Sequence, residues 1–160
     1  MKPRAKVGGE IGLRIVVTDP VPGVRLMMQS GRTDLVPPTS ASAAEVCFDC
    51  AVRVVELDDG TPNFLGAFTH GPPSARFLYI NAGRQAGEAN TCWDRRAKIP
   101  LGAITMAQVH DALGEDCALV VRINGRAKDG GPVCATVKLP EGAWRVARRS
   151  RVRSNRGSEQ

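Results

Sequence analysis

The segment 63–83 contains the feature that most restricts the fold of this chain, a rigid turn flanked by aromatic residues. Its Gly71-Pro72-Pro73 run forces a turn, because each proline holds φ at roughly −65° and has no N–H to donate. Three of the four phenylalanines, the only tyrosine and one of the two histidines lie around this turn. The apolar run Phe77–Ile80 that follows is typical of a buried strand. We therefore expect two core strands here, Phe64–Phe68 and Arg76–Asn81.

Alternating apolar and polar residues predict further strands, which cover residues 11–17, 24–28, 46–54, 118–123 and 133–137. The polar segment 31–44 between them is expected to be a loop. Turn-forming residues separate the first two strands and also the last two. We expect each of these two pairs to form a hairpin.

One helix is predicted to begin at Thr105. Thr105 and Gln108 have the spacing of a capping box, in which each side chain bonds the backbone N–H of the other residue. Gly114 is a typical residue to follow the C-terminus of a helix. Met106, Val109 and Leu113 lie on one face, so we expect this face to pack against a sheet.

These elements predict an all-β fold, with α+β as the alternative. The architecture that we expect is a mainly antiparallel β-sandwich or partly closed barrel with one packed α-helix. The length of 160 residues fits one domain. We expect a flexible lead-in at 1–10, a single globular domain at 11–146 and a basic, disordered tail at 147–160.

The cysteines favour a reducing compartment. They are five in number, which is odd, and we see no apolar leader before the first strand, so we expect a cytoplasmic protein. No apolar run approaches the length of a membrane span. Cys47 and Cys50 are spaced as a CxxC pair, but residues i and i+3 of a strand point to opposite faces. We expect no metal and no cofactor, and a mechanism that uses Cys92 with a histidine is a minor alternative.

Positive charge is concentrated at the C-terminal end. The net charge is +6, and residues 145–156 contain six arginines and no acidic residue. Basic segments bind nucleic-acid backbones through counterion release. One hypothesis is therefore nucleic-acid binding through Arg148, Arg149, Arg151 and Arg153, and a merely solubilising tail is the alternative.

Three motifs resemble a known family. They are PNFLGAFTHGPPSARFLYINAG at residues 62–83, WDRRAKIPL at 93–101 and RAKDGGPVCATV at 126–137, followed by Trp144. Over about residues 11–146 the chain resembles a family of small bacterial proteins known as domain-of-unknown-function family 5990. Ala67 stands where that family commonly has proline. The resemblance implies no activity, so no functional residue is carried over from it.

The best candidate site is a group of basic and aromatic residues. It would form if the Gly71-Pro72-Pro73 turn and the segment 93–101 come together in the fold. Guanidinium groups bind carboxylates and phosphates in bidentate geometry. The alternative is a solvated basic face whose arginines pair with Asp94 and Glu88. The candidate residues are His70, Arg76, Tyr79, Arg95, Arg96 and Lys98.

The function predicted from these residues is a non-enzymatic binding or interaction module. Its partner would be an anionic small molecule or an acidic protein, and the oligomeric state is not predicted. One alternative is a small enzyme of unknown reaction that uses a His/Tyr/Arg pocket, and another is a nucleic-acid-associated protein that acts through the tail. An enzyme requires the candidate residues to converge on a concave site, whereas a binding module does not.

Overall fold

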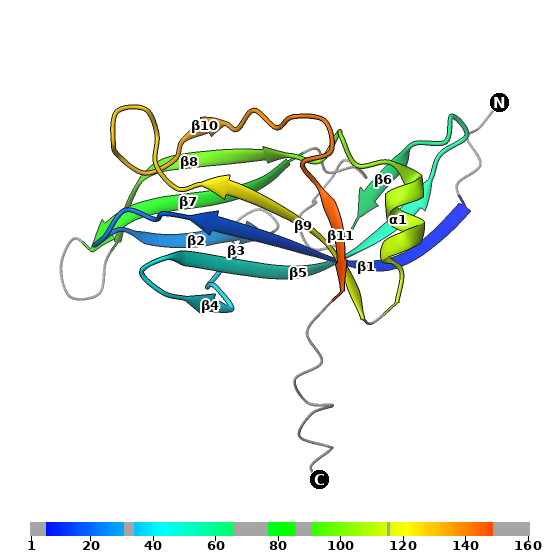
Figure 1. Cartoon of the computed structure of the whole chain (residues 1–160), viewed down its shortest axis with the longest axis horizontal. Coiled ribbons are helices and arrows are strands. Elements are labelled where there is room, and N and C mark those ends of the chain that lie inside the picture. The colour runs from blue at the N-terminus through cyan, green and yellow to red at the C-terminus, as the bar shows by residue number, and fades with distance from the viewer. Residues whose placement is uncertain (1–5, 31–33, 66–76, 86–90, 115, 149–160) are drawn as a thin grey trace, which may run out of the picture.

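The computed structural model describes residues 6–30, 34–65, 77–85, 91–114 and 116–148, which form two β-sheets and one short helix (Figure 1). The first sheet contains β1 (Lys6–Thr18), β4 (Ser40–Ala41), β5 (Glu45–Glu56), β6 (Pro62–Leu65), β9 (Cys117–Asn124) and β11 (Arg145–Arg148). The second sheet contains β2 (Arg25–Ser30), β3 (Asp34–Val36), β7 (Phe77–Gln85), β8 (Thr91–Pro100) and β10 (Ala135–Thr136). The helix α1 spans Met106–Ala112.

The first sheet is built around β1 and β5. These two strands pair antiparallel from Lys6 opposite Glu56 to Thr18 opposite Glu45. On its other side β1 pairs with β9 in parallel, and β11 adds to β9 as the last strand. The strand order is β11-β9-β1-β5-β4, with β6 also paired to β5.

The second sheet has the order β10-β8-β7-β2-β3. Its inner face packs on the inner face of the first sheet, and both contribute to one continuous core. Phe48, Leu13 and Val121 from the first sheet and Leu78 and Ile99 from the second are all at most 1% exposed. The predicted all-β fold with one packed helix is therefore confirmed, in the form of two facing sheets.

The strand pairings differ from the two predicted hairpins. β1 and β2 do not pair with each other, because β1 belongs to the first sheet and β2 to the second. Similarly, β9 lies in the first sheet, whereas β10 pairs with β8 in the second. Apolar alternation shows which face of a strand is buried, and two strands of opposite sheets both face the same core. Both predicted strand pairings were wrong for this reason, although an isolated antiparallel bridge joins Arg126 to Pro132 in the turn after β9.

Several element boundaries also differ. Strand β1 begins at Lys6, so residues 6–10 pair with β5 and are part of the sheet. The expected loop 31–44 contains β3 and β4. β7 continues past Asn81 to Gln85 through a register shift after Ala82. β11 runs to Arg148, two residues beyond the expected end of the domain.

The helix begins as predicted. The Oγ1 atom of Thr105 accepts a hydrogen bond of 3.2 Å from the backbone N–H of Gln108, and the N–H of Thr105 donates to Oε1 of Gln108 at 3.0 Å. Met106 and Val109 are buried as expected, whereas Leu113 follows the helix and is 36% exposed. In the described ranges, no helix is both long and apolar enough to cross a membrane.

Trp144 holds the helix and the end of β8 together. This side chain is 1% exposed, and its Nε1–H donates a hydrogen bond of 3.0 Å to the carbonyl oxygen of Pro100. Its own carbonyl oxygen accepts a bond of 2.7 Å from Nε2 of Gln108. The helix N-terminus, the end of β8 and the start of β11 are thereby fixed at one end of the molecule.

Candidate functional site

Two cations and two aromatic rings lie together on the outer face of the second sheet. The guanidinium carbon of Arg96 lies 5.0 Å from the centre of the Tyr79 ring, and the ammonium nitrogen of Lys98 lies 5.6 Å from the centre of the Phe77 ring. At such distances the face of an aromatic ring attracts a cation. The two ring centres are 6.3 Å apart. We call Phe77, Tyr79, Arg96 and Lys98 the cation–aromatic cluster.

The pairing of β7 with β8 produces this cluster. Tyr79 lies directly opposite Lys98 in the antiparallel ladder. Successive residues of a strand point to opposite faces, so Ala97 and Ile99 enter the core while Arg96 and Lys98 are exposed. Each long cationic side chain then reaches a ring diagonally across the ladder. β8 therefore has a basic outer face and an apolar inner face.

A buried amide orients the arginine of the cluster. The side chain of Asn81 is only 6% exposed, and its Oδ1 atom accepts a hydrogen bond of 3.4 Å from Nε of Arg96. Its Nδ2 atom donates at 3.4 Å to Oε1 of Gln29. These bonds connect β2, β7 and β8 across the sheet surface. They restrict the direction of the guanidinium group before any ligand is present.

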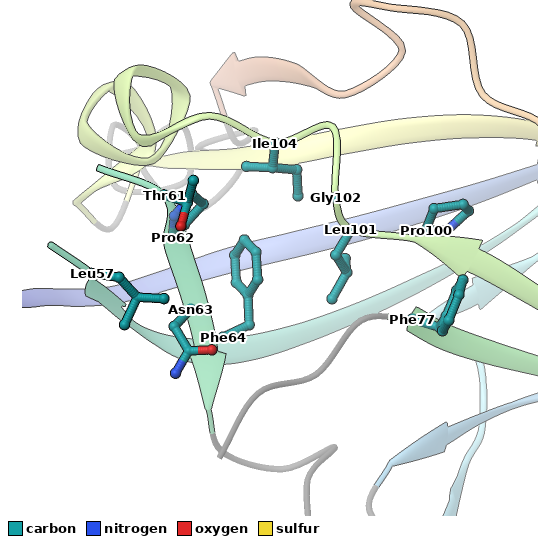
Figure 2. Close-up of a pocket in the computed structure, with 10 residues that line it drawn as sticks. All are labelled: Leu57, Thr61, Pro62, Asn63, Phe64, Phe77, Pro100, Leu101, Gly102 and Ile104. Atoms are coloured by element: carbon teal, nitrogen blue, oxygen red, sulfur yellow. The ribbon is translucent and has the colours of Figure 1, made fainter. Parts of the chain in front are cut away.

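An apolar pocket lies beside the cluster (Figure 2), at the end of the molecule that carries β6 and α1 (Figure 1). Its volume is about 470 Å³. Three segments that are distant in the sequence form its walls: the β5–β6 turn with β6, the start of β7, and the connection from β8 to α1. The lining residues are Leu57, Thr61, Pro62, Asn63, Phe64, Phe77, Pro100, Leu101, Gly102 and Ile104.

Phe77 belongs to both the pocket and the cluster. Its ring lines the pocket, and the ammonium nitrogen of Lys98 lies above the same ring. Figure 2 shows Phe77 and Pro100 on one side of the pocket, with Leu57 and Thr61 on the opposite side. The hydrophobic cavity and the positive charge are therefore adjacent.

Arg95 lies apart from the cluster, although it precedes Arg96 in the chain. Its Nη2 atom lies 2.9 Å from Oδ2 of Asp129, and its Nη1 atom donates to the carbonyl oxygen of Pro132 at 3.0 Å. The hydrogen bond to Arg95, followed by a bond from the N–H of Gly131, lowers the pKa of Asp129 to about 2. Arg95 thus has a structural partner, and the structure separates it from the anion site expected for it.

The other predicted site residues divide into two groups. Arg148 is exposed at the end of β11. His70 and Arg76, and the tail residues Arg149, Arg151 and Arg153, lie outside the described residues. The roles suggested for His70 and Arg76, and nucleic-acid binding through the tail, therefore stay predictions.

The two cysteines of the CxxC pair lie in β5. Cys47 and Cys50 are both free, and they occupy opposite faces of β5. Cys50 packs against the core, and this burial raises the pKa of its thiol to about 12. Within the part of the chain that the structure describes, no three His, Cys, Asp or Glu residues are grouped so that they could hold a metal ion.

Sequence reasoning named Tyr79, Arg96 and Lys98 as candidates but named neither Phe77 nor the pocket. Leu57, Leu101 and Ile104 resemble ordinary core residues, and nothing in their spacing marks a cavity. The one available signal was the Pro100-Leu101-Gly102 sequence directly after the basic residues of β8. It places a turn beside Lys98, but a turn alone does not predict a cavity.

Comparison with known proteins gives one match. The sequence matches the family described as "Family of unknown function (DUF5990)" over residues 11–147. The match extends from within β1 to within β11 and so includes strands of both sheets. No curated protein and no solved structure matches the chain.

Proposed function

The chain belongs to the family of unknown function DUF5990, and we propose that it is a binding module that holds an anionic group at Arg96 and Lys98. The observation that carries this proposal is the cation–aromatic cluster itself. In it, two exposed cations lie over aromatic rings, and among the described residues neither cation has a carboxylate within 4.0 Å.

Other arginines in the described part of the chain form ion pairs with carboxylates. Arg14 pairs with Asp49, Arg95 with Asp129, Arg122 with Glu45 and Arg126 with Asp19. A cation that already contacts a carboxylate has little attraction left for a second anion. Arg96 and Lys98 have no such partner among the described residues, so their charges can attract a ligand.

The aromatic rings contribute by pre-organisation. Arginine and lysine side chains lose much rotamer freedom when they bind a ligand. Here Tyr79 and Phe77 already hold the two cationic groups, and Asn81 adds a hydrogen bond to Arg96. Part of the entropy that the two side chains would lose on binding is therefore already lost before an anion binds.

Binding of simple anions tests the proposal. Amide chemical shifts would be followed by NMR while citrate and inorganic phosphate are added, in separate titrations at low ionic strength. We expect either probe to shift the amides of β7 and β8, because both carry the acidic oxygens that these cations bind. The shifts should diminish as salt is added, since the cluster is exposed.

Two double variants of equal net charge identify the site. Arg96→Gln with Lys98→Gln should weaken anion binding about tenfold, which corresponds to about 1.4 kcal/mol. The matched control is Arg53→Gln with Lys128→Gln, which removes two exposed cations elsewhere and should leave binding unchanged. Equal losses in both variants would show that net charge alone attracts the anion, and the proposal would fail. It would also fail if the parent bound neither probe.

A further inference from the structure

We propose that the pocket beside the cation–aromatic cluster binds the hydrocarbon part of an amphipathic carboxylate whose head group lies at Lys98. This inference rests on the anion site proposed above and adds the chemical class of the ligand. Its basis is that Phe77 lines a hydrophobic pocket and also lies under Lys98, a cation with no carboxylate partner among the described residues.

The pocket suits a hydrocarbon chain. Its volume of about 470 Å³ lies within the usual range of small-ligand sites, roughly 300–1,000 Å³. Phe64, Leu101 and Ile104 are each at most 3% exposed and supply apolar walls. None of the described lining residues is charged. Burial of hydrocarbon against such walls is favourable in proportion to the apolar area removed from water.

The charges at the two ends of the pocket favour one orientation. At the end opposite Phe77, Thr61 donates two hydrogen bonds to Asp59, from its hydroxyl at 2.6 Å and from its N–H at 3.0 Å. These bonds lower the pKa of the Asp59 carboxyl, which therefore stays ionised at neutral pH. An ionised carboxylate repels an anionic head group, whereas Lys98 attracts it. The head group is expected at Lys98, and the hydrocarbon chain at Leu101 and Ile104.

A ligand that uses only the cations, or only the pocket, leaves the other part of the site unused. A small hydrophilic anion would use Arg96 and Lys98 but leave the apolar walls exposed to water. A neutral hydrocarbon would fill the pocket but make no use of Lys98, which lies over the ring of Phe77. An amphipathic carboxylate satisfies both parts.

Three probes separate these possibilities: octanoate, octanol and acetate, each titrated into the full chain below its aggregation concentration. Octanoate should bind at least tenfold more tightly than acetate, which lacks the chain, and than octanol, which lacks the charge. The terminal methyl of octanoate should show nuclear Overhauser effects to the methyl groups of Leu101 and Ile104.

Two variants separate the contribution of the Lys98 charge from that of the apolar pocket. Lys98→Met should weaken octanoate binding about tenfold and leave octanol binding unchanged. Gly102→Trp fills part of the pocket from a position where an added Cβ meets nothing within 4 Å. It should weaken octanoate and octanol binding and leave acetate binding unchanged. Gly102→Ala is the matched control, and it should bind octanoate as the parent does.

The outcomes distinguish this inference from the anion site itself. If acetate and octanoate bind equally and both depend on Arg96 and Lys98, the anion site stands and the pocket inference is overturned. If octanol binds as tightly as octanoate and Lys98→Met affects neither, the pocket takes neutral molecules and the carboxylate assignment is overturned. If no probe binds, the pocket inference is overturned, and the citrate and phosphate titrations decide the anion site separately.

Discussion

At the scale of single residues, Arg95 and Arg96 show how position on a strand decides the role of a side chain. The two are neighbours in β8, yet Arg95 bonds Asp129 and the carbonyl oxygen of Pro132, whereas Arg96 lies over the Tyr79 ring. Their side chains leave opposite faces of the strand. Two consecutive cations in a strand therefore lie in separate environments, and here only Arg96 belongs to the candidate site.

The Arg95–Asp129 pair predicts a pH dependence of stability. The pKa of Asp129 is about 2 in the folded protein, below its ordinary value of 3.8. The ionised form thus stabilises the fold at pH values above 3.8, and this contribution is lost as the pH falls from about 4 to 2. Asp129→Asn should remove this component of the acid sensitivity. Urea denaturation at pH 6 and pH 2.5 would measure it.

The effect should be small and sensitive to salt, because the carboxylate is exposed. Asp129→Asn in an Arg95→Gln background is the control. With the main partner removed, the substitution should alter the pH dependence less than it does in the parent. An identical effect in both backgrounds would show that Arg95 is not the cause of the depressed pKa.

At the scale of secondary structure elements, the ends of β1 and β9 approach each other unusually closely. The N–H of Gly125, which follows β9, donates a hydrogen bond of 2.6 Å to the carbonyl oxygen of Thr18 at the end of β1. A Cβ atom at Gly125 would lie 2.9 Å from that same oxygen and from Cγ1 of Val17. Glycine avoids this steric conflict because it has no Cβ atom.

Gly125→Ala should therefore lower the free energy of unfolding by about 1–3 kcal/mol, the usual cost of forcing additional volume into a packed site. Chemical denaturation would measure the change. Gly102→Ala is the control, since Gly102 is exposed and an added Cβ there meets nothing within 4 Å. It should change stability by less than about 0.5 kcal/mol. Equal stabilities for the two variants would contradict the close approach.

At the scale of the whole molecule, both sheets depend on a shared core. The inner face of β5 contributes Phe48, which is fully buried, and the inner face of β7 contributes Leu78 and Ile80, which are also fully buried. Phe77 and Tyr79 point outward and are only half-buried. The run Phe77–Ile80 is therefore covered on one face and carries the candidate site on the other.

Phe48→Ala should lower the free energy of unfolding by about 3–5 kcal/mol, a large part of the roughly 5–15 kcal/mol typical of a domain. Amide hydrogen exchange should accelerate in β1 and β7 together, because the two sheets share the core. Phe77→Ala should cost less, since its ring is half exposed. Phe48→Leu is the second variant if the alanine form does not fold. If the amides of β7 stayed protected from exchange while those of β1 lost protection, the shared core would be contradicted.

Much of the local structure could be predicted because its causes lie within a few residues. The capping box of Thr105 and Gln108 spans four positions, and the helix begins where it predicts. The alternation along 46–54 correctly assigned the buried face of β5. The outward position of Arg96 and Lys98 agrees with the same two-residue period. The run Phe77–Ile80 was predicted as buried, but Phe77 and Tyr79 are only half-buried.

Tertiary structure decided which strands are neighbours and where a cavity remains. Alternation does not distinguish a strand of the same sheet from one of the facing sheet, so β1 and β2 were wrongly paired. The pocket depends on how Leu57, Phe77 and Leu101 meet from separate parts of the chain. The sequence by itself therefore determined the face on which each side chain lies, which is set by backbone geometry. Only packing between distant segments decided which strands pair and where the pocket lies. This packing depends on the shapes of both surfaces at once, and no single segment of sequence contains both.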